Sequence, residues 1–166
     1  MSEQQLRDQL YASFRHRAML YYLIFDELRQ TLDEPQAIEI MQRAIRRRGE
    51  EMGKQLASFA PHDLAGLRDA FLTLIPDDGR MFSAQVERCD AGQLDITLHN
   101  CPLRDAWLDA GLDQQDVATM CHVAAAIDEG MFTGAGFSFS ADTWTPNCEG
   151  CCHLHIRPGP QGMREN

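Results

Sequence analysis

The hydrophobic pattern of the chain changes its period near residue 80, and this change limits the fold more than any other feature. Over residues 6–32, apolar side chains recur every three or four positions, as on a helix with one buried face. Residues 81–87 and 93–98 instead alternate apolar and polar side chains, as half-buried strands do. Helices followed by strands predict an α+β fold, in which N-terminal helices pack on one face of a small antiparallel sheet.

Local signals divide the first part of the chain into helices. We expect them over residues 2–32, 34–57 and 63–74. Ser2 and Gln5 have the spacing of a capping box, which opens the first helix. In the second helix, Gly49 and Gly53 have no side chains and would let another element approach closely.

The second part of the chain combines strands with a central pair of helices. The strands at 81–87 and 93–98 form a hairpin around a turn at residues 90–93. Two helices then interrupt the sheet, one starting at Pro102 and one near Asp113 that ends just before Gly130. After a glycine-rich bend over residues 130–136, two more strands are expected, at 137–140 and 151–156.

Length and composition favour one domain. A chain of 166 residues with 44% apolar content can bury a single core. We therefore expect one domain over residues 1–157, with a helical part at 1–76 and the sheet plus two helices at 80–157. The segment 158–166 is rich in Pro and Gly and is expected to be a disordered tail.

The charge balance argues against some classes of partner. The net charge is −10 and the pI is near 4.9, whereas nucleic acids and anionic membranes require a basic surface. Neither is expected as a partner. Lys54 is the only lysine among fifteen basic residues, and the arginines could hold the carboxylate of a small anionic substrate. The sequence leaves open whether the chain forms a homo-oligomer.

The N-terminus has no apolar signal segment, and no run approaches the ~18 apolar residues of a membrane span, so a cytoplasmic protein is expected. Cysteines are reduced in that compartment, which favours chemistry or metal binding over a disulfide framework. The chain has six of them: Cys89, Cys101, Cys121, Cys148, Cys151 and Cys152.

Cys101 lies where a strand gives way to a helix. Pro102 suits the first helical position, which places Cys101 at the N-cap. Free amide groups and the helix dipole favour an anion there, so this thiol is expected to ionise readily. A Cys-Pro step can also be a simple turn at the end of a strand.

Asp128 lies on the apolar stripe of the second central helix, seven residues after Cys121. Burial and a place in the last turn would both raise the pKa of this carboxyl group, which suits a general acid or base near neutral pH. The alternatives are that Asp128 faces solvent at a frayed helix end and that Cys121 is only a small core residue.

The last predicted strand carries a second set of ligand-type side chains. Alternation puts Cys152 on the core face, toward Cys101 and Cys121, and leaves Cys151, His153 and His155 as an exposed row. Such a row could bind a transition metal, with Cys148 in support. The three inward cysteines could bind zinc instead.

These residues together resemble the L-2-amino-thiazoline-4-carboxylic acid hydrolase-like proteins. The resemblance rests on Cys101-Pro102-Leu103 after a strand, Gly111, Cys121 seven residues before Asp128, and Cys151-Cys152 before alternating apolar residues. It covers residues 93–157 well and the N-terminal helices in general layout. Where this chain has Leu154 and Ile156, the family pattern has aromatic residues.

The resemblance implies a hydrolase that acts on carbon–nitrogen bonds and opens the cyclic amidine ring of a small sulfur-containing amino acid. Cys101 or an activated water would attack, Asp128 would shuttle the proton, and Cys121 and Cys152 would line the pocket. An unidentified arginine, with residues 46–48 as one option, would hold the substrate carboxylate. The alternatives are a non-catalytic or sensory module that binds zinc or another soft metal, and a metal-dependent hydrolase.

Overall fold

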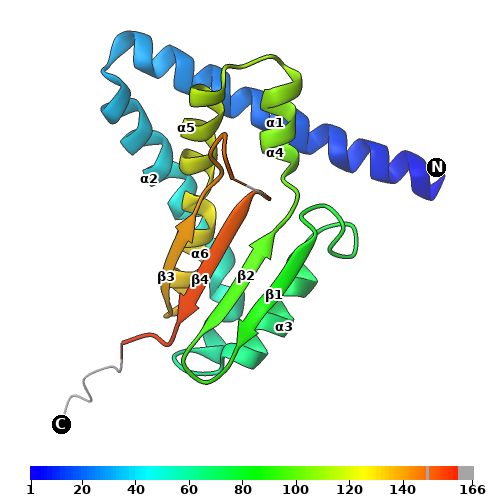
Figure 1. Cartoon of the computed structure of the whole chain (residues 1–166), viewed down its shortest axis with the longest axis vertical. Coiled ribbons are helices and arrows are strands. Elements are labelled where there is room, and N and C mark those ends of the chain that lie inside the picture. The colour runs from blue at the N-terminus through cyan, green and yellow to red at the C-terminus, as the bar shows by residue number, and fades with distance from the viewer. Residues whose placement is uncertain (149, 161–166) are drawn as a thin grey trace.

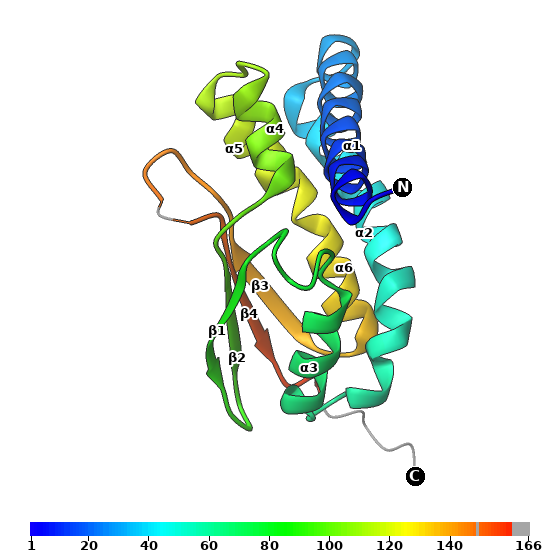
Figure 2. The same cartoon turned by 90° about the vertical axis from the view of Figure 1, so that its right-hand side faces the viewer.

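A computed structural model describes residues 1–148 and 150–160. It contains a four-stranded antiparallel sheet with the helices on one of its faces, which confirms the predicted α+β class (Figures 1 and 2). The helices are α1 (Glu3–Thr31), α2 (Glu34–Gly53), the 3₁₀ helix η1 (Lys54–Phe59), α3 (Leu64–Leu74), α4 (Pro102–Asp109), α5 (Gln114–Ala124) and α6 (Ala126–Ala135). The strands are β1 (Ala84–Cys89), β2 (Leu94–Leu98), β3 (Ser138–Asp142) and β4 (Cys152–Arg157).

The N-terminal helices begin at the residues that their capping signals predict. The Ser2 hydroxyl accepts a hydrogen bond from the Gln5 amide, and the Gln5 side chain accepts one from the Ser2 amide. The second helix is shorter than the predicted 34–57. Its α-helical part ends at Gly53. The following turns tighten into the 3₁₀ helix η1, which continues to Phe59.

Glycines allow α2 and α6 to cross with their backbones in contact. A Cβ atom at Gly49 would collide with the backbone of α6, and one at Gly130 would collide with the backbone of α2. The predicted role of Gly49 is therefore confirmed, but the predicted bend at residues 130–136 is wrong. This segment is helical because Gly130 lies in a tight helix–helix contact, and the chain leaves α6 only at Gly136, whose φ is +103°.

The sheet has the order β1-β2-β4-β3, and every neighbouring pair is antiparallel. The hairpin of β1 and β2 and the two later strands were all predicted. Leu94, Ile96, Leu154 and Ile156 alternate toward the helices and are buried. The sheet therefore has a covered apolar face and an outer face that lies away from the helices (Figure 2).

The segment after β4 is described as far as Pro160. The Gly159 amide donates a hydrogen bond of 3.0 Å to the Pro61 carbonyl, which ties this segment to the loop before α3. Of the tail expected to be disordered, residues 161–166 lie outside the described residues. Across residues 1–148 and 150–160, none of the helices combines the length and apolar character needed to cross a membrane.

Candidate functional site

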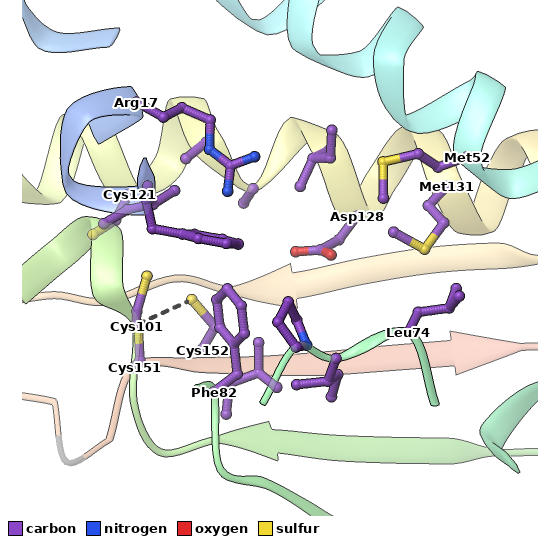
Figure 3. Close-up of a pocket in the computed structure, with 18 of the residues that line it drawn as sticks. Arg17, Met52, Leu74, Phe82, Cys101, Cys121, Asp128, Met131, Cys151 and Cys152 are labelled. Carbon is purple, nitrogen blue, oxygen red and sulfur yellow. Dashed lines mark hydrogen bonds between the residues drawn. The ribbon is translucent and has the colours of Figure 1, made fainter. Parts of the chain in front are cut away.

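A cavity of about 340 Å³ lies between the helical layer and one end of the sheet. Its walls come from all six α-helices and from the ends of β2 and β4. The four residues predicted as catalytic, Cys101, Cys121, Asp128 and Cys152, all line it, together with Cys151 (Figure 3). The fold thus brings together side chains that are far apart in the sequence, since Cys101 and Cys152 are separated by 51 positions.

Cys101 is the N-cap of α4, as predicted, and Pro102 is the first helical residue. The pKa of the Cys101 thiol is lowered from its ordinary value, chiefly because the Cys151 thiol hydrogen-bonds to it. The amide groups of Leu103 and Arg104 add to this effect, although the sulfur makes no capping hydrogen bond of ordinary geometry. Cys101 therefore ionises more readily than an ordinary thiol.

Arg104 provides a positive charge beside these thiols. Its guanidinium donates to the Gly150 carbonyl at 3.0 Å and to the Asp105 carboxylate at 2.7 Å, so its position is fixed from two sides. The charge of Arg104 helps lower the pKa of Cys101, and the side chain is only 14% exposed. Limited exposure to solvent strengthens this interaction.

Two other cavity cysteines, Cys121 and Cys151, hold their protons more tightly than a free thiol does. Burial raises the pKa of Cys121, and hydrogen bonding to Cys101 raises that of Cys151. The sulfur atoms of Cys151 and Cys152 are 3.6 Å apart (dashed line in Figure 3). Cys152 thus lies in the cavity with Cys101 and Cys121, as predicted.

The predicted exposure of Cys151 is wrong, because the residue is 1% exposed. Strand β4 begins at Cys152, so the alternation that placed Cys151 with His153 and His155 does not extend back to it. Its amide bonds to the Leu98 carbonyl at 3.0 Å, and its thiol turns toward Cys101. The row on the outer face therefore consists of the two histidines alone, and both are half-buried.

Asp128 does line the cavity, but its predicted place in a helix is wrong. The helix that begins after Asp113 ends at Ala124, and Asp128 lies in the first turn of α6, where the helix dipole favours negative charge. Burial nevertheless raises the pKa of Asp128 to about 7. The carboxyl group is half-buried, its accessible part faces the cavity, and it makes no hydrogen bond or ion pair with any described residue (Figure 3).

Two arginines line the cavity, and one of them was missed by the sequence reasoning. Arg48, one of the suggested residues 46–48, is bound to Glu51 at 2.9 Å, and Arg46 is bound to Glu129 at the same distance. Arg17 on α1 lies with its guanidinium 4.1 Å from the Phe14 ring centroid and pairs with no carboxylate in the described part of the chain. Its side chain extends toward the cavity (Figure 3).

A signal for Arg17 exists in the sequence. Phe14 and Tyr21 lie three residues before it and four after it on the same helical stripe, so Arg17 is at the border of the buried face. Both aromatic residues also line the cavity.

The two histidines are bound to polar neighbours on the outer face of the sheet. The His153 Nδ1 lies 3.0 Å from the Thr97 hydroxyl, and His155 lies 2.9 Å from Asp95 and 3.2 Å from Asp142. Within residues 1–148 and 150–160, no group of three or more His, Cys, Asp or Glu side chains is arranged to hold a metal ion. The suggested metal sites, at Cys101, Cys121 and Cys152 or at Cys151, His153 and His155, therefore have no support in the structure.

An ionisable thiol, an unpaired carboxyl group and an unpaired arginine around one cavity define a site of the kind found in enzymes that act on small molecules. The family model of L-2-amino-thiazoline-4-carboxylic acid hydrolase matches residues 11–156. The chain therefore belongs to this family, whose name denotes hydrolysis of a thiazoline carboxylate. A search of curated proteins found no match.

Proposed function

We propose that the protein hydrolyses a small cyclic amidine that carries a carboxylate, of the 2-aminothiazoline-4-carboxylate type. The family name supports this substrate class. The observation that carries the proposal is that Cys101 and Asp128 line the same cavity. The pKa of Cys101 is lowered and that of Asp128 is raised to about 7, so the thiol gives up its proton more readily than usual while the carboxyl group can hold one near neutral pH.

The thiolate of Cys101 is the proposed nucleophile. Its sulfur bonds to the ring carbon that lies between nitrogen and sulfur, and the electron pair of the C=N bond moves to nitrogen. When the adduct collapses, one of two ring bonds to this carbon breaks. If the carbon–sulfur bond breaks, the C=N bond re-forms and the sulfur takes the proton of Asp128. If the carbon–nitrogen bond breaks, the nitrogen takes the proton of Asp128 and one from the exocyclic amino group, which becomes the new C=N. Water then adds to the carbon, Asp128 takes back a proton from it, and Cys101 leaves as a thiolate. One water molecule is consumed, and the enzyme returns to its starting state.

Arg17 is the proposed partner of the substrate carboxylate. It is the arginine of the cavity that has no carboxylate partner among the described residues, and a guanidinium binds a carboxylate through two parallel hydrogen bonds. Anchoring at Arg17 would orient the ring between Cys101 and Asp128. Cys121 and Cys152 would line the ring site, as the sequence predicted.

The direct test is to incubate the purified protein with 2-aminothiazoline-4-carboxylate and to follow loss of the ring and release of a free thiol or amino group. The group released identifies the ring bond that breaks. We expect Cys101→Ala to lower the rate by about 10² to 10⁴-fold and Arg17→Gln mainly to raise KM. Cys89→Ala, at the end of β1 outside the cavity, is the matched control.

Two results would overturn the proposal. One is a wild-type protein that does not turn over the thiazoline. The other is a Cys101→Ala variant that keeps the wild-type rate, which would leave direct attack by water, with Asp128 as its base, in place of the thiolate.

A further inference from the structure

The cavity extends beyond the groups assigned to the reaction. Its far part, which we call the apolar end, is lined by Met52, Phe71, Leu74, Ile75 and Met131. In Figure 3, Met52, Leu74 and Met131 lie on the opposite side of Asp128 from the four cysteines. The cavity thus has a thiol end, a central carboxyl group and an apolar end.

The apolar end lies largely in the protein interior, with three of its five residues buried and Met52 and Leu74 half-buried. Phe71, Ile75 and Met131 are 5%, 7% and 4% exposed and belong to the hydrophobic core beneath the sheet. The charged residues Arg17 and Arg48, by contrast, are exposed on α1 and α2. A substrate held by its carboxylate at Arg17 therefore has its charged group near solvent, while the rest can reach inward.

The cavity is larger than an unsubstituted thiazoline carboxylate requires. A buried apolar cavity of about 150 Å³ holds a benzene-sized ligand, so a ring with about nine non-hydrogen atoms needs about 225 Å³ at the same ratio. The cavity here is about 340 Å³. The remaining space, about 115 Å³, would hold about four or five more carbon atoms on this scale.

We propose that the substrate of this protein carries an apolar substituent of about four or five carbon atoms, which fills the apolar end while the ring lies between Cys101 and Asp128. This inference rests on the proposed function for the position of the ring. Two methionines suit such a role because their flexible side chains adapt to the shape of a bound apolar group. The unsubstituted ring would leave the apolar end without a contact.

The inference is tested by comparing kcat/KM for the unsubstituted thiazoline carboxylate with that for analogues bearing a butyl group at ring carbon 5 or at the exocyclic nitrogen. We expect kcat/KM for at least one butyl analogue to be higher by about tenfold or more, since a single methylene group in an apolar pocket can change kcat/KM by about that factor. Leu74→Trp fills the apolar end and should bring that ratio close to one. Leu74→Ala enlarges the end and should shift the preference to a longer chain.

Leu108→Trp is the control, because Leu108 is 39% exposed on α4 and lies outside the cavity. It should keep the wild-type ratio. A wild-type preference for the unsubstituted ring, or a ratio that does not change in either Leu74 variant, would overturn the inference while leaving the proposed reaction intact.

A binding measurement separates the inference from the reaction. Thiazole carboxylates with and without the butyl group have an aromatic ring that resists hydrolysis, and their affinities can be measured by calorimetry. If the wild-type protein hydrolyses neither thiazoline, the proposed function fails, but tighter binding of the butyl thiazole that is lost in Leu74→Trp still supports the apolar end as a binding site. Equal affinity for the two thiazoles would refute it.

Discussion

Asp128→Asn should stabilise the protein at alkaline pH while slowing the reaction. The substitution keeps the shape of the side chain and removes its ability to ionise. Burial raises the pKa of Asp128 from 3.8 to about 7, which means that ionising this group in the folded state is unfavourable. Converted at about 1.4 kcal/mol per pH unit, the difference corresponds to a cost of up to about 4 kcal/mol, less where cavity water solvates the carboxylate.

The sign of the pH dependence follows from the raised pKa. Below about pH 4 the carboxyl group is neutral in both the folded and the unfolded chain, so it contributes no cost. Between about pH 4 and pH 7 the unfolded chain loses this proton while the folded protein keeps it, and the free energy of unfolding falls as the pH rises. Above pH 7 the cost is complete.

Asp128→Asn should therefore match the wild type near pH 4 and exceed it near pH 8. At about 2–4 °C per kcal/mol for a chain of this size, the gain in Tm at pH 8 would reach about 8–16 °C at most. The single-turnover rate on the thiazoline should fall by about 10² to 10⁴-fold in the same preparation. Thermal unfolding at pH 4 and pH 8, together with rapid-quench kinetics, measures both quantities. A lower Tm at pH 8 with an intact rate would refute the role of Asp128 as an unpaired proton shuttle.

Three further predictions concern the thiols and the helix crossing. Cys101 should be alkylated before Cys89 at pH 6–7, and peptide mapping that finds the reverse order would contradict its lowered pKa. Arg104→Gln should shift the pH profile of Cys101 alkylation to higher pH, and an unchanged profile would remove the arginine from this role. Gly49→Ala should lower the free energy of unfolding, measured by urea titration, by at least about 2 kcal/mol, because the new Cβ would meet the α6 backbone. Gly92→Ala, in an open turn, is the control and should change it by less than about 0.5 kcal/mol.

The features that the sequence predicted best are those set by neighbours within a few residues. The Ser2 capping box, the start of the third helix at residue 63 and the position of Cys101 before Pro102 depend on contacts one to three residues away, and the structure contains all of them. The sequence also predicted which side chains of β2 and of β4, from Cys152 onward, face the core. Successive residues of a strand point to opposite faces, so the face of each follows from its place in the strand.

The errors arose where distant parts of the chain decide the local structure. Gly130 resembles a helix stop, but it lies inside α6, where α2 crosses. Asp128 is in a first turn and not a last one because α5 ends at Ala124 and α6 begins at Ala126. Cys151 lies one residue before β4, where its side chain is positioned by the contact with Cys101 and not by strand alternation. Arg17 resembles the other arginines of α1 until the packing of that helix places it at the cavity.

The most direct test of the central claim is the mass of the protein during a single turnover. Excess enzyme is mixed with the thiazoline carboxylate, quenched with acid at millisecond intervals, and analysed by intact-mass spectrometry and peptide mapping. The account predicts a transient adduct on Cys101, absent from Cys101→Ala and longer-lived in Asp128→Asn, where the proton shuttle is missing. Turnover at the wild-type rate in Cys101→Ala, with no adduct on any cysteine of the wild-type protein, would contradict it.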